Sequence, residues 1–462
     1  MREQAKDPIR TMFCPEALIL DGFAQEDESS LRPLSVLTSV LENAGAGVTR
    51  HRLRDMNLAH CKGCFDCWIR TPGMCSLSDT CEQILQDVIL SDVTILFTPV
   101  TFGGYSSVLK RAVDRFIPLI LPFFGRYLGE THHTPRYSNY PRLVGIGVQS
   151  APDKADADLF KSLVGRNALN FHAPSFAAEV VSDEDDAEIL HERLERAVFR
   201  FDPCRKEVRS AYPENPVEAE EQNGPHPGRA LLIIGSPKIK KRSTSSILGK
   251  ALLSTMECNG WETESLTLKT SLERDQGQAE LCTAVDRSDL IILALPLYVD
   301  ALPYLVTKAL EIIHQHKKHS GASKHQRLFT LINNGFPEHE HNASALAICR
   351  RFADQSGLVW AGSLAMGAGE AIGGGQELTD PKRSGPPAGH ILQALDQAGR
   401  ELSAGRSVSR EAQGLMSKTP LPCVPEWIWR RLFPKFGLRW WKLKAREHGV
   451  GRQDMSAKPY AD

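Results

Sequence analysis

Short stretches that are apolar throughout alternate with amphipathic stretches along the chain. Apolar runs lie at residues 17–20, 93–97 and 143–148, and a helical pattern covers residues 31–43 between the first two runs. Strands that are apolar throughout are typical of a parallel sheet covered on both faces. The first part of the chain is therefore predicted to form an open α/β unit of βαβ order.

The same order restarts at Arg229. Apolar runs follow at residues 230–234, 290–295 and 328–332, and a helical pattern covers residues 244–258. The segment SDVTILFTPVTFGGYSSVLKRAVD, from Ser91, aligns with SDLIILALPLYVDALPYLVTKALE, from Ser288. Two copies of one unit are therefore predicted. We expect domains at residues 1–202 and 229–405, an exposed linker rich in Pro, Glu and Gly at 203–228, and a basic, Trp-rich tail at 406–462.

The composition is that of a globular protein. The chain has 462 residues, of which 42% are hydrophobic, and 55 basic residues nearly balance 56 acidic ones. This balance gives no support to a nucleic-acid partner. No apolar run reaches the ~18–20 residues of a membrane span, and the first residues lack the apolar core of a signal peptide. We therefore expect a cytoplasmic protein without a transmembrane segment.

The cysteines are clustered. Five of the eleven lie between Cys61 and Cys81. From first turn to third strand the first copy runs 70 positions, Asp21 to Ser91, and the second runs 53, Gly235 to Ser288. The difference is 17 residues, and the segment 61–75 occupies 15 of them. The cysteine segment is therefore interpreted as an insertion into the first copy.

The second copy carries a turn suited to a phosphate group. Gly235-Ser236-Pro237-Lys238 and then Ser243-Thr244-Ser245 precede a predicted helix. Hydroxyl groups and free N–H groups at a helix N-terminus can bind a phosphate monoester, although Ser243 or Thr244 can equally be a plain helix cap. The Walker and three-glycine dinucleotide patterns are absent. Two further loops follow neighbouring strands, so all three are expected to converge on one crevice: Pro296-Leu297-Tyr298 and Asn333-Asn334-Gly335.

Together these three segments resemble the NADPH-dependent FMN reductase branch of the flavodoxin-like fold. The resemblance implies two tandem flavodoxin-like sheets of strand order 2-1-3-4-5, with helices on both faces of each. It also implies FMN as cofactor and NAD(P)H as a transient donor. By resemblance the FMN phosphate would be held by Ser236, Lys238, Ser243, Thr244 and Ser245, and the isoalloxazine ring would be bordered by Pro296, Leu297, Tyr298, Asn333, Asn334 and Gly335.

The first copy departs from this pattern. Its first turn carries four acidic residues between positions 21 and 28, which would repel a phosphate dianion. Its later loop nevertheless keeps the shape of a flavin-ring contact, with glycines that permit close approach. That loop either faces a flavin held elsewhere or is vestigial; its candidate residues are Pro99, Thr101, Phe102 and Gly103.

The cysteine segment has the spacing C-x2-C-x2-C-x7-C, formed by Cys61, Cys64, Cys67 and Cys75. Four thiolates suit a 4Fe-4S cluster or zinc. The spacing resembles the compact motif of the iron-sulfur flavoproteins, which belong to the same superfamily. Related reductases carry similar cysteines without an established cluster, so a redox-active thiol pair and a buried turn of small residues remain alternatives.

The tail is basic and aromatic. Residues 426–447 contain four of the seven tryptophans, seven basic residues and two acidic ones. This composition suits a membrane surface, a partner groove or a nucleic-acid backbone, or else a cover over an apolar side of the second domain. Pro434 and Gly437 are predicted to split the segment into two short pieces.

The overall expectation is an FMN-dependent oxidoreductase, NAD(P)H-dependent, that passes electrons to a small acceptor such as a quinone or a flavin, with or without an iron-sulfur cluster. The halves are expected to form an intramolecular pseudo-dimer in which the cysteine segment approaches FMN in the second half. The main alternative is an electron-transfer or redox-sensing module that serves a protein partner. A third is a scaffold whose flavin sites have decayed.

Overall fold

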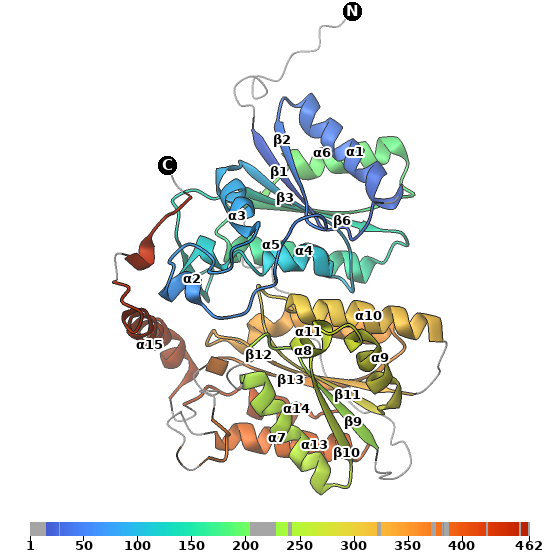
Figure 1. The fold of residues 1–462 in the computed structure, drawn as a ribbon, viewed down its shortest axis with the longest axis vertical. Helices are drawn as coiled ribbons and strands as arrows, with labels where there is room; N and C mark the ends of the chain where they lie inside the picture. Colours follow the sequence, from blue (N-terminus) through green and yellow to red (C-terminus); the bar gives the residue numbers. More distant parts are fainter. Residues whose placement is uncertain are drawn as a thin grey trace, which may run out of the picture.

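The computed structural model describes residues 15–26, 28–203, 228–238, 243–320, 325–370, 376–380, 382, 388–421, 424–451 and 454–460. The predicted linker 203–228, apart from its two end residues, lies outside the described residues. The described residues form two stacked α/β domains with a long helix beside them (Figure 1).

The first domain is built on a parallel sheet. Its strands are β1 (Glu16–Asp21), β2 (Gly47–Arg52), β3 (Val93–Pro99), β6 (Arg142–Gln149) and β7 (Ser175–Ser182), in the order β2-β1-β3-β6-β7. The short strand β8 (Asp202–Pro203) joins the edge of β7 in antiparallel orientation. The predicted order 2-1-3-4-5 is confirmed. Helices cover both faces: α1 (Glu28–Asn43) and α6 (Ala187–Phe199) on one, and α3 (Cys81–Leu90), α4 (Ser107–Val113) and α5 (Lys154–Asn170) on the other.

Burial on both faces explains the unbroken apolar runs. In β1, Ala17 and Ile19 pack with the α1 and α6 face, whereas Leu18 and Leu20 pack with the opposite face. Successive side chains of a strand point to opposite sides, so a strand covered twice needs apolar residues at every position.

The second domain repeats this plan. Strands β9 (Arg229–Ile234), β10 (Glu262–Thr267), β11 (Leu290–Pro296), β12 (Arg327–Asn333) and β13 (Val359–Met366) are parallel, in the order β10-β9-β11-β12-β13. The helices on one face are α7 (Thr244–Cys258), α13 (Gly389–Ser403) and α14 (Arg410–Met416). Those on the other are α8 (Leu268–Leu272), α9 (Gly277–Arg287), α10 (Tyr304–Ser320) and α11 (Ala343–Gln355).

The domains pack through equivalent helices. In Figure 1, α4 and α5 of the first domain face α10 and α11 of the second. Helices α4 and α10 follow the third strand of their sheets, and α5 and α11 follow the fourth. One hydrophobic cluster runs through both domains. At its edge Ser107 donates from its backbone nitrogen and its hydroxyl to Glu311, at 2.7 and 2.6 Å. The two halves therefore associate like the subunits of a two-fold dimer.

Three elements are added to this plan. The first domain contains the hairpin β4 (Ile120–Tyr127) and β5 (Glu130–Pro135), and the short helix α2 (Asp66–Ile69) within the cysteine segment. The tail forms α15 (Glu426–Arg446). None of the described helices is both long enough and apolar enough to cross a membrane.

Helix α15 is continuous, so the predicted split at Pro434 and Gly437 is wrong. Both residues lie inside the helix. A Cβ atom on Gly437 would lie 2.4 Å from Phe124 Cε2, so the glycine lets α15 approach β4 closely. The inner face of α15 packs on β4 and α2 of the first domain, and Trp429 and Phe433 reach Ala368 of the second. The tail therefore covers the junction of the domains rather than one side of the second domain.

Candidate functional site

A cavity of about 430 Å³ lies where the two domains and α15 meet, and we call it the interdomain cavity. Most of its lining is aromatic or aliphatic, which suits a planar aromatic ligand. The cysteine segment contributes Phe65 and Trp68, the hairpin contributes Phe124 and His133, the loops after β11 and β12 contribute Leu297, Tyr298, Asn334 and Gly335, and α15 contributes Trp429, Phe433, Phe436, Trp440 and Trp441.

The second-domain loops meet here because parallel strands end at the same edge of a sheet. The backbone nitrogen of Leu297 donates to the Asn333 carbonyl at 2.8 Å, which joins the two loops. Val299 and Asp300 have φ values of 52° and 53°, in the left-handed region that side chains other than glycine rarely adopt. Lys110 of α4 donates to the Tyr298 carbonyl at 2.9 Å. The first domain therefore holds the strained turn that presents Tyr298.

The predicted ring contacts divide into two sets. Leu297, Tyr298, Asn334 and Gly335 line the interdomain cavity. Pro296 and Asn333 end their strands and do not line it. Asn333 instead donates to Ser245 Oγ at 2.9 Å, which connects the loop after β12 with the start of α7.

The predicted phosphate turn lies beside the cavity rather than in its lining, and Ser236 and Ser245 are buried there. Ser243 caps α7 by accepting from the Ser246 nitrogen at 3.2 Å, and Thr244 donates to the Gly369 carbonyl at 3.0 Å. Ser243 thus has the cap role that the sequence left open.

Lys238 connects the phosphate turn to the cavity edge. Its Nζ lies 2.8 Å from Glu370 Oε1, and Glu370 lines the interdomain cavity. The same nitrogen lies 5.3 Å from the ring centre of Phe65, in cation–π geometry. One cation thus touches both the second-domain acid and the cysteine segment.

The corresponding first-domain loop packs against the second domain. Phe102 meets His314 of α10 and Phe352 of α11 edge to face, at 5.3 and 5.2 Å between ring centres. A Cβ on Gly104 would lie 2.9 Å from Ile348 Cδ1. The close approach that the glycines permit is therefore made by protein helices. None of the four candidates in this loop lines the interdomain cavity: Pro99, Thr101, Phe102 and Gly103.

The acidic first turn of the first domain carries its own counter-charges. Arg50 pairs with Asp21 at 2.5 Å and with Glu26 at 2.8 Å. Arg54 pairs with the same two acids at 3.3 and 2.6 Å. Hydrogen bonds from Arg50 and Arg54 lower the pKa of Glu26. Carboxylates already satisfy the arginines here, so this turn offers little to a phosphate.

Cys61, Cys64, Cys67 and Cys75 line a second, smaller cavity, which we call the cysteine cavity. Gly63 and Phe65 have φ values of 62° and 61°, so the backbone coils tightly between the cysteines. Among the described residues, no three of these sulfurs lie within 4.8 Å of one another. A single tetrahedral zinc would hold its sulfurs about 3.8 Å apart. The four thiols, as placed here, therefore do not form a tetrahedral zinc site.

Burial makes Cys61 and Cys67 poor nucleophiles. Burial raises the pKa of Cys61 to about 12 and that of Cys67 well above its usual value. A reactive cysteine needs a pKa near or below neutral pH, so Cys61 and Cys67 do not have the character of a redox-active thiol pair. Cys81 is buried in α3 and does not line the cysteine cavity.

The two cavities are adjacent, because Phe65 and Ile117 line both. The cysteine segment also touches the second-domain loop directly, since a Cβ on Gly63 would lie 2.2 Å from the Tyr298 hydroxyl oxygen. Phe65 stacks on Trp68 at 5.3 Å between ring centres.

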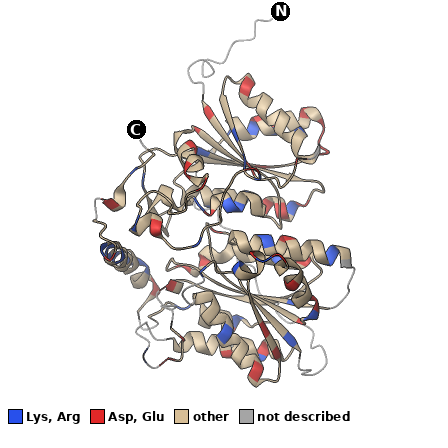
Figure 2. Ribbon diagram, viewed as in Figure 1, with Lys and Arg blue, Asp and Glu red and all other residues tan. Residues whose placement is uncertain are grey.

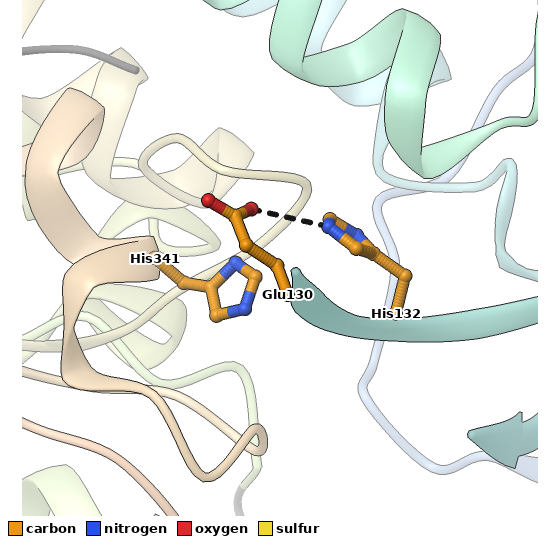
Figure 3. Close-up of side chains that lie close together, drawn as sticks. All are labelled: Glu130, His132 and His341. Carbon is orange, nitrogen blue, oxygen red and sulfur yellow. Dashed lines mark hydrogen bonds and ion pairs between the residues drawn. The ribbon is translucent and has the colours of Figure 1, made fainter. Parts of the chain in front are cut away.

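A buried charge network adjoins the interdomain cavity. Figure 3 shows Glu130 and His132 of β5 facing His341, which belongs to the short 3-10 helix η3 (His339–Asn342). Their ligand atoms all lie within 4.8 Å of one another, as in a metal site. Arg166, however, donates to Glu130 at 2.5 Å, and its guanidinium lies 2.9 Å from His341 Nδ1. The guanidinium occupies the atoms that a metal would need, so this is an ion-pair network.

Arg166 also donates to Asp300, a cavity residue, at 3.1 Å. Burial alone would raise the pKa of Asp300, but Arg166 and His341 more than offset it, so the pKa lies far below its usual range. The sequence predicted no role for Arg166, Asp300 or His341. They come from three separate elements and share no motif, so no sequence pattern could have brought them together.

Comparison with known proteins found similarity over part of the chain. The NADPH-dependent FMN reductase family matches residues 15–182. An iron-sulfur flavoprotein of Methanocaldococcus jannaschii is 39% identical over 71 residues, which are 15% of this chain and 36% of that protein. One of Archaeoglobus fulgidus is 28% identical over 82 residues, 18% of this chain and 39% of that protein. The matched part is thus well under half of either relative's length.

The solved structures that match cover only part of the chain. An azoreductase from Bacillus anthracis is 10% identical with a TM-score of 0.28, and covers 38% of this chain and 99% of its own. An NAD(P)H:quinone oxidoreductase from Methanothermobacter marburgensis is 14% identical with a TM-score of 0.28. The match covers 38% of this chain and 96% of that protein.

Proposed function

We propose that the protein is a flavin-dependent oxidoreductase that takes electrons from NAD(P)H and passes them to a small acceptor such as a quinone or a free flavin. The match of residues 15–182 to the NADPH-dependent FMN reductase family supports this proposal, although the match lies in the first domain and not in the second-domain loops. One observation carries the proposal. The loops that resemble flavin contacts border an apolar cavity, and four cysteines surround a second cavity that shares Phe65 with it.

In this proposal the isoalloxazine ring of FMN occupies the interdomain cavity. Leu297, Tyr298, Asn334 and Gly335 would hold it from the second domain, and Phe65 and Trp68 from the first. FMN, when bound, supplies hydride acceptance and one-electron chemistry. The aromatic lining keeps water from the ring, and Asn334 is fixed by donating to the Glu338 carbonyl at 2.9 Å.

The phosphate of FMN would be held by the turn before α7. Lys238 offers the positive charge, now paired with Glu370. The hydroxyl groups of Ser236, Ser243, Thr244 and Ser245 lie around the same helix start, and Pro296 and Asn333 support the neighbouring loops.

The cysteine cavity would hold a 4Fe-4S cluster through Cys61, Cys64, Cys67 and Cys75, and such a cluster transfers single electrons. The contact of Gly63 with Tyr298 supports its placement next to the flavin. Each chain would then work as an intramolecular pseudo-dimer, with the cluster on one domain and FMN on the other.

Anaerobically purified protein provides the test. The absorbance spectrum and the iron, sulfide and flavin contents should show flavin with about four irons for each flavin. Cys67→Ser should lose iron and keep flavin, whereas the matched variant Cys81→Ser should keep both, because Cys81 does not line the cysteine cavity. Purified protein that contains flavin but no iron would reject the cluster and leave the flavin proposal standing.

Turnover separates the remaining possibilities. NAD(P)H oxidation with quinone or flavin acceptors should be measurable in steady state. A flavin-containing protein without such turnover would contradict the reductase and favour an electron carrier for a protein partner. Protein that stays colourless after FMN addition would reject both.

A further inference from the structure

The outward face of α15 combines large apolar side chains with cations. Trp427 is 69% exposed, and the other members follow at intervals of one, three or four residues, so they share one side of the helix. Figure 2 shows Lys and Arg gathered along this helix. The exposed apolar members are Trp427, Leu432, Phe436, Trp440 and Leu443, and the exposed cations are Arg431, Lys435, Arg439 and Arg446.

The opposite face fixes the orientation of α15. Trp429, Phe433, Trp441 and Ala445 are buried. Arg430 pairs with Glu340 of the second domain at 2.7 Å. The outward apolar side chains are therefore exposed to solvent, although Phe436 also contacts Trp429 and Trp440 also contacts Trp441.

We propose that the outward face of α15 docks the protein on the surface of an anionic lipid bilayer. Its four cations form no ion pair with the described residues. The two acids of the helix ends are neutralised locally, Glu426 by Arg430 and Glu447 by Lys444. Tryptophan, phenylalanine and leucine side chains enter the headgroup region, while Lys and Arg reach lipid phosphates.

Charge distinguishes a bilayer from a second copy of the chain. In a two-fold contact a surface meets itself, so four cations would face four cations. The whole chain has a net charge of -1, so the positive charge of α15 is a local feature. An anionic lipid surface is complementary to it.

Docking would also place the interdomain cavity at the lipid surface. Phe436 and Trp440 belong to the outward face and also line that cavity. A quinone dissolved in the bilayer would then be the class of acceptor that reaches the site. This extension rests on the proposed function, whereas docking itself does not.

Vesicle flotation of the full-length protein tests docking. The protein should bind phosphatidylglycerol-containing vesicles, bind phosphatidylcholine vesicles much more weakly, and lose binding at high salt. The triple variant Arg431→Glu/Lys435→Glu/Arg439→Glu should partition onto these anionic vesicles at least about 30-fold more weakly than the wild type. Each cation near an anionic surface strengthens binding by about fivefold. Trp427→Asp/Leu443→Asp should also bind more weakly.

A matched variant controls for a general surface effect. Ile189→Asp changes a side chain that is 52% exposed on α6, away from α15, and should bind vesicles like the wild type. The α15 substitutions do not touch the cavity lining, so the melting temperature and flavin content should not change. Docking is overturned if anionic vesicles do not bind, or if the triple variant binds them as well as the wild type.

The acceptor is tested with a long-chain quinone embedded in the vesicles and a short-chain quinone in water. The triple variant should slow reduction of the embedded quinone at least about tenfold and leave the water-soluble one unchanged. If the triple variant reduces the embedded quinone as fast as the wild type does, the extension is overturned while docking stands. Absence of turnover with either quinone would count against the proposed function, and vesicle binding would still report on docking.

Discussion

Replacement of Gly63 by alanine should weaken the contact between the cysteine segment and the second domain. Gly63 has φ of +62°, and its added Cβ would lie 2.2 Å from the hydroxyl oxygen of Tyr298. Such atoms cannot approach so closely, so either the cysteine segment or the loop after β11 must move.

Two costs add up in this variant. A left-handed backbone costs an alanine about 1–2 kcal/mol. Forcing an extra carbon into a packed contact typically costs about 1–3 kcal/mol more. The free energy of unfolding should therefore fall by about 2–5 kcal/mol. Gly260 is a matched control, because it has φ of +82° and nothing lies within 4 Å of the place that an added Cβ would take. Gly260→Ala should cost only about 1–2 kcal/mol.

Urea unfolding followed by tryptophan fluorescence measures both variants. The double variant Gly63→Ala/Tyr298→Phe supplies the decisive comparison. It removes the clashing oxygen and leaves Tyr298 Cζ at 3.5 Å, an ordinary contact, so most of the excess cost should disappear. The reasoning is refuted if Gly63→Ala costs no more than Gly260→Ala, or if the phenylalanine gives no recovery.

Three further predictions concern stability. Arg166→Met should lower the free energy of unfolding by about 3–5 kcal/mol, because it leaves Glu130 and Asp300 buried without their counter-charge. In the same urea unfolding experiment Arg229→Met, which breaks a surface pair with Glu262, should cost less than about 1 kcal/mol. Burial lowers the pKa of His341, but Asp300 and Glu338 raise it on balance. The protonated His341 therefore adds to the free energy of unfolding in full below about pH 6.5, and this contribution is lost as pH rises through the raised pKa. His341→Gln should therefore remove part of the decline in the free energy of unfolding above that pH, and an unchanged alkaline slope would contradict this. Deletion of residues 451–462 removes the carbonyls of Met455 and Ala457, which accept from buried Arg136 at 3.0 and 2.6 Å; a melting temperature equal to that of the full chain would contradict the expected loss of about 1–3 kcal/mol.

The sheet order was predictable because it depends on local patterns. Each central strand of a doubly covered sheet must be apolar on both sides, as Leu18 and Ile19 show in β1. The convergence of the loops at Leu297 and Asn334 followed from the same topology, since both loops leave the same edge of one sheet.

Some features could not be predicted from the sequence pattern, because contacts between distant residues determine them. Glycines at 103 and 104 indicate that something approaches the backbone closely, but not what approaches; here Leu159 and Ile348 do. Pro434 lowers helix propensity, yet α15 continues through it because one side of the helix is packed on the protein. Tertiary contacts decided both cases, and they involve residues far away in the sequence.

Joining two equivalent halves in one chain has an evolutionary consequence. In a symmetric dimer every substitution appears twice, so a residue that improves one site alters its counterpart as well. In this chain Gly63 faces Tyr298 without a second Gly63 elsewhere, and Phe102 can be committed to Phe352 and His314 without closing the other site. Each wall of the interdomain cavity is encoded once, and selection can therefore change one wall while the others stay as they are.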